Sequence, residues 1–158
     1  MKPEDAPVFN ALNDSEAAVL NIYGEARGEI FAGKQAVAQV IANRAAKHKQ
    51  NIKEVVYAPN QFSCLISTDP NYPKLRALAG DFKTVGLDDL FNNVTDGKVL
   101  QECVAAWKGD RSEVAGRING ATFYEVHGTK NEWFDKMKDK GKLVYTASFG
   151  SHDFYKET

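Results

Sequence analysis

The segment of residues 23–29, which reads YGEARGE, places two carboxylates beside glycines at the end of an apolar run. Glu25 is the first of these carboxylates, and Gly24 and Gly28 flank it so that other groups can approach closely. A glutamate held partly out of water at such a place can serve as a general acid near neutral pH. The competing interpretation is a surface pair of Glu25 and Glu29, four positions apart on a helix and neutralised by neighbouring basic side chains. The segment by itself favours the surface pair. A catalytic role for Glu25 therefore needs support from the rest of the sequence.

Other catalytic signatures are absent from the sequence. It has no G-x-S-x-G elbow, no glycine-rich phosphate loop and no H-E-x-x-H motif. A zinc site built from His127, His152 and a cysteine or aspartate stays open, although no two ligands have the short spacing typical of zinc sites. Cys64 and Cys103 form no C-x-x-C pair; two isolated buried thiols are preferred, and a single bridge between them stays open. We therefore expect a protein without a metal or another cofactor.

The helix that must carry Glu25 has a recognisable beginning and end. It starts at Asn13, because Glu16 three positions later completes a capping box. Its apolar residues run to Tyr23, and the glycines of the YGEARGE segment end it. The next helix, from about residue 33 to residue 48, carries the clearest buried stripe of the chain. Three polar residues on another arc of that helix are candidates to line a groove: Gln35, Gln39 and Asn43.

The remaining elements are helices first and strands later. Residues 52–57 predict a weaker helix that stops at Pro59, and residues 99–108 predict an amphipathic helix. Residues 67–97 are rich in Asp, Asn, Pro and Gly, which indicates loops around short helices. Short strands are expected at residues 121–126, 143–146 and 149–155. The chain is therefore expected to be of the α+β class, mainly helical, with a small β element near its end.

Length and charge narrow the classes of protein that fit. The chain has 158 residues, 43% hydrophobic and 26% charged, which suits one globular domain over residues 13–158 behind a loose lead-in over residues 1–12. The net charge is -1 and both halves are balanced, so the basic surface of a nucleic-acid binder is missing. The longest uncharged stretch, residues 55–68, contains Pro, Asn, Gln and Ser, which excludes a membrane span. The first residues lack a secretory signal, so we expect a cytoplasmic protein before any release.

An ordered set of short motifs favours the catalytic interpretation of Glu25 over the surface pair. Glu25 and the Gly-Glu pair after Arg27, together with later segments, resemble the SleB/CwlJ family of bacterial cell wall hydrolases, whose relatives include spore-cortex-lytic enzymes and phage lysins. The later segments are GKQAVA at 33–38, VIANR at 40–44, VVY at 55–57, QFS at 61–63, GATFY at 120–124, Trp133 and HDFY at 152–155. The resemblance covers residues 17–65 and 100–155, and residues 66–98 are interpreted as a variable insertion.

The resemblance implies a lysozyme-like fold of the lytic transglycosylase type, with a helical lobe, a small β element and a groove between them. It implies that Glu25 is the catalytic acid and that the substrate is the glycan strand of peptidoglycan, cut between N-acetylmuramic acid and N-acetylglucosamine. Trp133 either stacks on a sugar or packs inside the protein. The residues expected to contact or support the substrate are Gln61, Ser63, Tyr124, Glu29 and His152. We expect a monomer that binds no nucleic acid and does not insert into a membrane.

Two chemistries and one non-catalytic role stay open. In a lytic transglycosylase, Glu25 protonates the leaving oxygen and then takes a proton from the C6 hydroxyl, which closes a 1,6-anhydro ring. A hydrolytic muramidase needs a second carboxylate, for which the candidates are Glu29, Asp69, Glu125 and Asp153. The non-catalytic alternative is a glycan-binding domain on a hydrolase scaffold. The first chemistry is preferred, and a chain with no leader and no wall-anchoring module suggests a phage-type endolysin that leaves the host cytoplasm through a holin-type pore.

Overall fold

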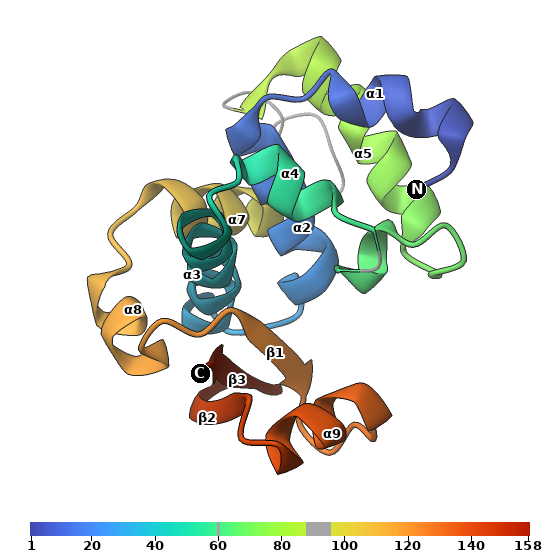
Figure 1. The fold of residues 1–158 in the computed structure, drawn as a ribbon. Helices are drawn as coiled ribbons and strands as arrows, with labels where there is room; N and C mark the ends of the chain where they lie inside the picture. Colours follow the sequence, from blue (N-terminus) through green and yellow to red (C-terminus); the bar gives the residue numbers. More distant parts are fainter. Residues whose placement is uncertain (60, 88–95) are drawn as a thin grey trace.

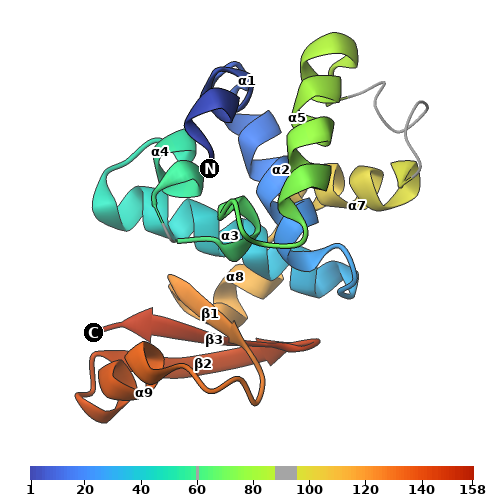
Figure 2. The same cartoon turned by 90° about the vertical axis from the view of Figure 1, so that its right-hand side faces the viewer.

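The computed structural model describes residues 1–59, 61–87 and 96–158. Most of its helices lie on one side of a small sheet, and one helix, α9, lies on the other side (Figures 1 and 2). The elements in chain order are η1 (Pro3–Asp5), α1 (Ala6–Asn10), α2 (Asp14–Ala26), α3 (Phe31–His48), α4 (Ile52–Tyr57), η2 (Ser63–Leu65), α5 (Tyr72–Val85), α7 (Gly97–Lys108), α8 (Ser112–Ile118), β1 (Phe123–Val126), α9 (Glu132–Asp139), β2 (Leu143–Phe149) and β3 (His152–Glu157). No described helix is long and apolar enough to cross a membrane.

Helix α2 is the central helix of the fold. Its expected capping box is confirmed, because the Asn13 side chain accepts from the Glu16 backbone N–H at 2.8 Å and the Glu16 carboxylate accepts from the Asn13 N–H at 2.9 Å. All residues from Ala17 to Tyr23 are buried, and α3, α4, α5 and α7 pack around them. The helix ends at Ala26, which confirms the predicted end and places Glu25 in its last turn.

Helix α3 is confirmed over the predicted range, but its polar arc does not line the cavity that holds Glu25. The Gln35 amide donates to the Asp110 carbonyl at 3.2 Å. Gln39 accepts from Arg111 at 3.0 Å, and the Asn43 amide donates to the Ala121 carbonyl at 2.8 Å. Gln35 and Gln39 fasten α3 to the segment between α7 and α8, and Asn43 fastens it to the segment that leads into β1. Gln35 also lines a smaller pocket of about 230 Å³ beside α8, away from Glu25.

Two segments expected to be loose are packed helices. Phe9 of α1 is fully buried, and the Tyr57 hydroxyl donates to the Phe9 carbonyl at 2.7 Å, so the loose lead-in over residues 1–12 is wrong. Within residues 67–97, where loops and short helices were expected, α5 runs for 14 residues. It buries one stripe at helical spacing, made of Leu75, Leu78, Ala79 and Phe82. The rest of that expectation, at residues 88–95, lies outside the described residues.

The sheet has the strand order β1-β3-β2, and both pairings are antiparallel. Its inner face contributes Phe149 and Phe154 to the main core beneath α3 and α8. Its outer face carries Tyr155, which forms a second small core with Phe134 of α9. The three strands were predicted, although Phe149 ends β2 and does not begin β3, because Gly150 turns the chain with a positive φ of 55°. Helices α8 and α9 were not predicted.

Candidate active site

Glu25 stands at the point where α2 meets η2. Its side chain is half-buried, and its Oε1 accepts the Cys64 backbone N–H at 3.3 Å and the Ser63 hydroxyl at 3.5 Å. Gly24 makes this approach possible, because a Cβ there would lie 2.7 Å from Cys64 Sγ. No described residue lies within 4 Å of a Cβ built on Gly28, so of the two glycines Gly24 shows the expected close approach in the described part of the chain.

A cavity of about 560 Å³ opens beside Glu25, between the helical lobe and the sheet. This volume is in the usual range for a ligand-binding site. Its walls are formed by Glu25, Arg44, Gln61, Phe62, Ser63, Ile66, Phe123, Tyr124, Glu125, Val126, Thr129, Asn131, Trp133, Phe134 and His152. The tertiary structure thus brings together the catalytic candidate and four of the expected substrate contacts, which come from α2, the 61–63 segment, β1 and β3.

The Tyr124 hydroxyl is one of three buried polar atoms of the cavity-lining residues that have no hydrogen-bond partner among the described residues. Burial, followed by the negative charge of Glu25, raises the pKa of Tyr124 well above its ordinary value. The phenol therefore keeps its proton and is available as a hydrogen-bond donor next to Glu25.

Arg44 places a buried positive charge in the cavity wall. Its side chain donates to the Thr122 carbonyl and to Gln61 Oε1, the latter at 3.3 Å. The guanidinium lies 4.8 Å from the centre of the Phe62 ring and 4.6 Å from that of Phe123. Burial lowers the pKa of Arg44. Arg44 ends the VIANR segment but was not among the expected site residues, and only the packing against β1 reveals its position in the cavity wall.

Glu29 lies outside the cavity and binds the turn between β2 and β3. Its Oε1 accepts the Ser151 backbone N–H at 3.2 Å and also the Ser151 hydroxyl. A Cβ on Gly150 would lie 2.8 Å from Glu29 Oε2, so the turn needs glycine there for its positive φ and for this close approach. These contacts fit the supporting role expected for Glu29 and do not place it against a substrate.

His152 lines the cavity from the inner face of β3. Its ring centre lies 5.0 Å from that of Tyr124. Its Nδ1 is 3.1 Å from Glu29 Oε1, but the two are not aligned for a hydrogen bond. Burial lowers the pKa of His152, and the negative charge of Glu29 opposes this shift without cancelling it.

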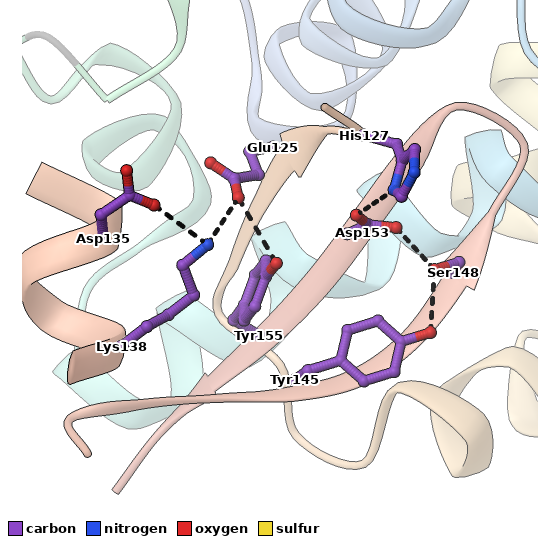
Figure 3. Close-up of polar contacts among 8 residues, drawn as sticks. All are labelled: Glu125, His127, Asp135, Lys138, Tyr145, Ser148, Asp153 and Tyr155. Carbon is purple, nitrogen blue, oxygen red and sulfur yellow. Dashed lines mark hydrogen bonds and ion pairs between the residues drawn. The ribbon is translucent and has the colours of Figure 1, made fainter. Parts of the chain in front are cut away.

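The zinc arrangement considered from the sequence is not assembled. His127 pairs with Asp153 at 2.8 Å on the outer face of the sheet, where Ser148 and Tyr145 continue the polar chain (Figure 3). His152 lies on the opposite, inner face. Across the described ranges, no group of three or more His, Cys, Asp or Glu residues could hold a metal ion.

Of the four candidates for a second carboxylate, Glu125 shares the cavity with Glu25. Its Oε1 accepts from Lys138 Nζ at 3.2 Å and from the Tyr155 hydroxyl at 3.4 Å (Figure 3). Its Oε2 is buried and has no partner among the described residues. Glu125 therefore enters the site as half of an ion pair, whereas Glu25 has no such cation partner in the described part of the chain.

Comparison with known proteins now decides the family. The model of the cell wall hydrolase family matches residues 28–155. The chain belongs to the cell wall hydrolase family. This cell wall hydrolase is accordingly an enzyme that degrades peptidoglycan, as the resemblance implied. The match begins at residue 28, three residues after Glu25.

Solved structures similar to this cell wall hydrolase support the same fold. The catalytic domain of the germination-specific lytic transglycosylase SleB from Bacillus anthracis superposes with a TM-score of 0.57 at 19% identity, covering 93% of this chain and 98% of that one. The catalytic domain of the Bacillus cereus SleB protein superposes with a TM-score of 0.56 at 20% sequence identity, covering 91% of this chain and 90% of that one. The expected mainly helical, lysozyme-like fold is confirmed. No curated protein matches the chain.

Proposed function

We propose that this cell wall hydrolase is a lytic transglycosylase that cuts the β-1,4 bond between N-acetylmuramic acid and N-acetylglucosamine, with Glu25 as general acid and then general base. The observation that carries the proposal is the difference between the two carboxylates in the cavity. Glu25 has no cation partner among the described residues, whereas Glu125 is paired with Lys138 at 3.2 Å. A mechanism that needs one free carboxylate fits this arrangement better than one that needs two.

The contacts of Glu25 indicate which of its atoms carries the proton. Oε1 accepts from the Cys64 N–H and the Ser63 hydroxyl, so Oε2 is left to hold the acidic hydrogen. In the first step this proton moves to the glycosidic oxygen, the bond from that oxygen to C1 of the muramic residue breaks, and N-acetylglucosamine leaves. General acid catalysis of this kind contributes about 10²–10⁴-fold.

The second step restores Glu25 without consuming water. The Glu25 carboxylate takes the proton of the C6 hydroxyl, and the C6 oxygen bonds to C1, which closes the 1,6-anhydro ring. The Tyr124 hydroxyl is the donor for the sugar at the cleavage point, because it keeps its proton beside Glu25 and has no aligned hydrogen-bond partner among the described residues. Gln61, Ser63 and His152 complete the contact surface around the scissile bond.

A hydrolytic muramidase is the second candidate, and the position of Glu125 in the same cavity is the observation in its favour. The two reactions differ in their products. A transglycosylase releases anhydro-muropeptides that are lighter by one water and lack a reducing end, whereas a muramidase releases reducing muropeptides. Mass spectrometry of digested peptidoglycan is expected to find the anhydro products, and a digest with only reducing products would reject the proposal.

The test of the catalytic residue is Glu25→Gln. This change keeps the size of the side chain but removes the transferable proton, so the lysis of purified sacculi should fall by about 10²–10⁴-fold. The fold and glycan binding should be unchanged. The matched control is Glu132→Gln, whose side chain is 85% exposed on α9. A Glu25→Gln enzyme that lyses walls normally would show that the site is misassigned, and a wild-type protein that binds glycan without cutting it would support the non-catalytic alternative.

The endolysin setting is a separate part of the proposal. Expression of the chain in a bacterial host should leave cells intact, and co-expression with a membrane-permeabilising holin should lyse them through peptidoglycan cleavage. Lysis by the chain without a holin would contradict this setting while leaving the chemistry at Glu25 untouched.

A further inference from the structure

The cavity continues well beyond the residues around Glu25. Its far end is formed by β1 and the segment that leads into α9, and it is lined by Phe123, Thr129, Asn131, Trp133 and Phe134. Trp133 is 46% exposed, which makes it one of the large apolar side chains that the fold leaves open to solvent. Its ring centre lies 5.3 Å from that of Phe123, at an interplanar angle of 50°. An aromatic surface therefore lies in the same cavity as the catalytic candidate.

This aromatic surface is held in place from behind. Phe134 is buried in the second core and meets the edge of the Trp133 ring, with centres 5.3 Å apart. Asn131 caps α9 by accepting the Phe134 N–H at 3.2 Å. Lys138 of α9 reaches across to Glu125 of β1 at 3.2 Å (Figure 3). A surface fixed in this way loses little conformational entropy when a ligand binds.

We infer that Trp133 and Phe123, together with Thr129 and Asn131, form an outer subsite that binds one pyranose ring of a glycan strand, away from the bond that is cut. The inference rests on the proposed function, because it takes the glycan as the ligand. A pyranose ring has an apolar face of C–H groups that packs on an aromatic ring, while its hydroxyl and acetamido groups hydrogen-bond to neutral amides and hydroxyls. The outer subsite offers both kinds of contact.

The charges at this end of the cavity favour a neutral sugar over the charged stem peptide. The residues that line the outer subsite are themselves uncharged. The charged groups that border it are Glu125, which pairs with Lys138 at 3.2 Å, and Arg44, which is buried 4.6 Å from the Phe123 ring and donates to the Thr122 carbonyl and to Gln61. The carboxylates and amines of a stem peptide would lose water against the uncharged lining, which is unfavourable.

The outer subsite predicts that substrate length matters. Binding energy gained on a remote sugar can be used to hold the scissile bond against Glu25. Long glycan strands should therefore be cut with a higher kcat/KM than fragments that fill only the cleavage point. Loss of Trp133 should lower kcat/KM for long strands more than for short fragments, which removes this advantage.

The direct experiment measures binding to intact Glu25→Gln protein, so that no cleavage intervenes. Glycan strands stripped of stem peptides are titrated into Glu25→Gln protein that carries Trp133→Ala, Trp133→Phe or Tyr145→Ala. Trp133→Ala should weaken binding by roughly tenfold, and Trp133→Phe by less, because it keeps an aromatic face. Tyr145→Ala is the control, since Tyr145 is 55% exposed but does not line the cavity. Circular dichroism confirms that each variant is folded.

Fluorescence gives a second readout that does not depend on affinity. The chain has two tryptophans, Trp107 and Trp133, and the Trp107 indole donates to Ser15 at 3.3 Å within the helical lobe. The emission change on adding glycan should persist in Trp107→Phe and disappear in Trp133→Phe. Unchanged glycan binding by Trp133→Ala, or competition by free stem peptide, would overturn the inference. If Glu25→Gln is inactive and Trp133→Ala in that background binds glycan normally, the outer subsite is rejected and the proposed function stands. If Glu25→Gln is active and Trp133→Ala weakens glycan binding, the proposed catalytic role of Glu25 is rejected and the outer subsite stands.

Discussion

Glu29 and Ser151 are 122 positions apart in the sequence, and the Ser151 backbone N–H donates to Glu29 Oε1 at 3.2 Å. This contact joins the chain just after α2 to the turn between β2 and β3. Glu25 lies at the end of α2, and His152 begins β3. The two walls of the cavity are therefore held in register by a pair of residues that lie outside it.

The first prediction concerns this contact between the lobes. Glu29→Ala should lower the free energy of unfolding by about 1–3 kcal/mol, because the Ser151 N–H and hydroxyl lose a charged acceptor. Lysis should fall as well, since Glu25 and β3 would no longer be held together. Urea unfolding measures the first effect. The control Glu132→Ala, on an exposed side chain, should stay within about 0.5 kcal/mol, and an equal result for both variants would contradict the role of Glu29.

The second prediction separates the two glycines around Glu25. Gly24→Ala should cost about 1–3 kcal/mol, because its Cβ would meet Cys64 Sγ at 2.7 Å and Leu75 Cδ1 at 2.8 Å. Gly28→Ala should change stability by no more than about 0.5 kcal/mol, because no described residue lies within 4 Å of its Cβ. Thermal unfolding of the two variants side by side provides the comparison. If Gly28→Ala were the more damaging change, the packing of η2 against α2 would be wrong.

The third prediction uses the unpaired hydroxyl of Tyr124. Tyr124→Phe removes a buried oxygen that has no described partner, so stability should stay the same or rise by up to about 1 kcal/mol. Activity on purified sacculi should fall about ten- to a hundredfold, because the substrate loses a donor at the cleavage point. A variant with full activity would show that the hydroxyl has no part in catalysis, whereas a large loss of stability would show an unrecognised structural bond.

The fourth prediction is a pH dependence of stability. The pKa of His152 is lowered from 6.5 in the folded protein by burial, so the unfolded chain binds more protons just below that pH. The contribution of the neutral His152 ring to the free energy of unfolding is fully present above about pH 6.5, and it is lost as the pH falls toward the lowered pKa. Urea unfolding at about pH 7 and at about pH 5 measures this loss of stability. Both pH values lie above the usual pKa values of Asp and Glu side chains, so carboxylates contribute little to the difference. His152→Gln should show a smaller loss, and equal losses would refute the assignment.

Local sequence signals predicted those elements whose cause is itself local. The Asn13 capping box and the buried stripe of α3 are examples, because capping and helical periodicity depend on residues three or four positions apart. Helix α5 was missed although its stripe is present, since the loop-forming composition of its surroundings outweighed it. Phe9 was missed because a short apolar segment gives no sign of the core that will bury it.

The sequence by itself determined that Glu25 lies near the end of an apolar helix beside a glycine and that the helices precede a small β element. The tertiary structure decided that the two thiols stay free, an outcome that the sequence favoured without excluding a bridge. Only the tertiary structure decided that Glu125 is neutralised by Lys138 while Glu25 has no cation partner among the described residues. It also decided that Glu29 binds the β2–β3 turn and does not line the cavity. The physical reason is the distance along the chain over which each effect acts. Helix propensity and hydrophobic periodicity depend on residues a few positions apart, whereas charge pairing and burial depend on which distant segments fold against each other.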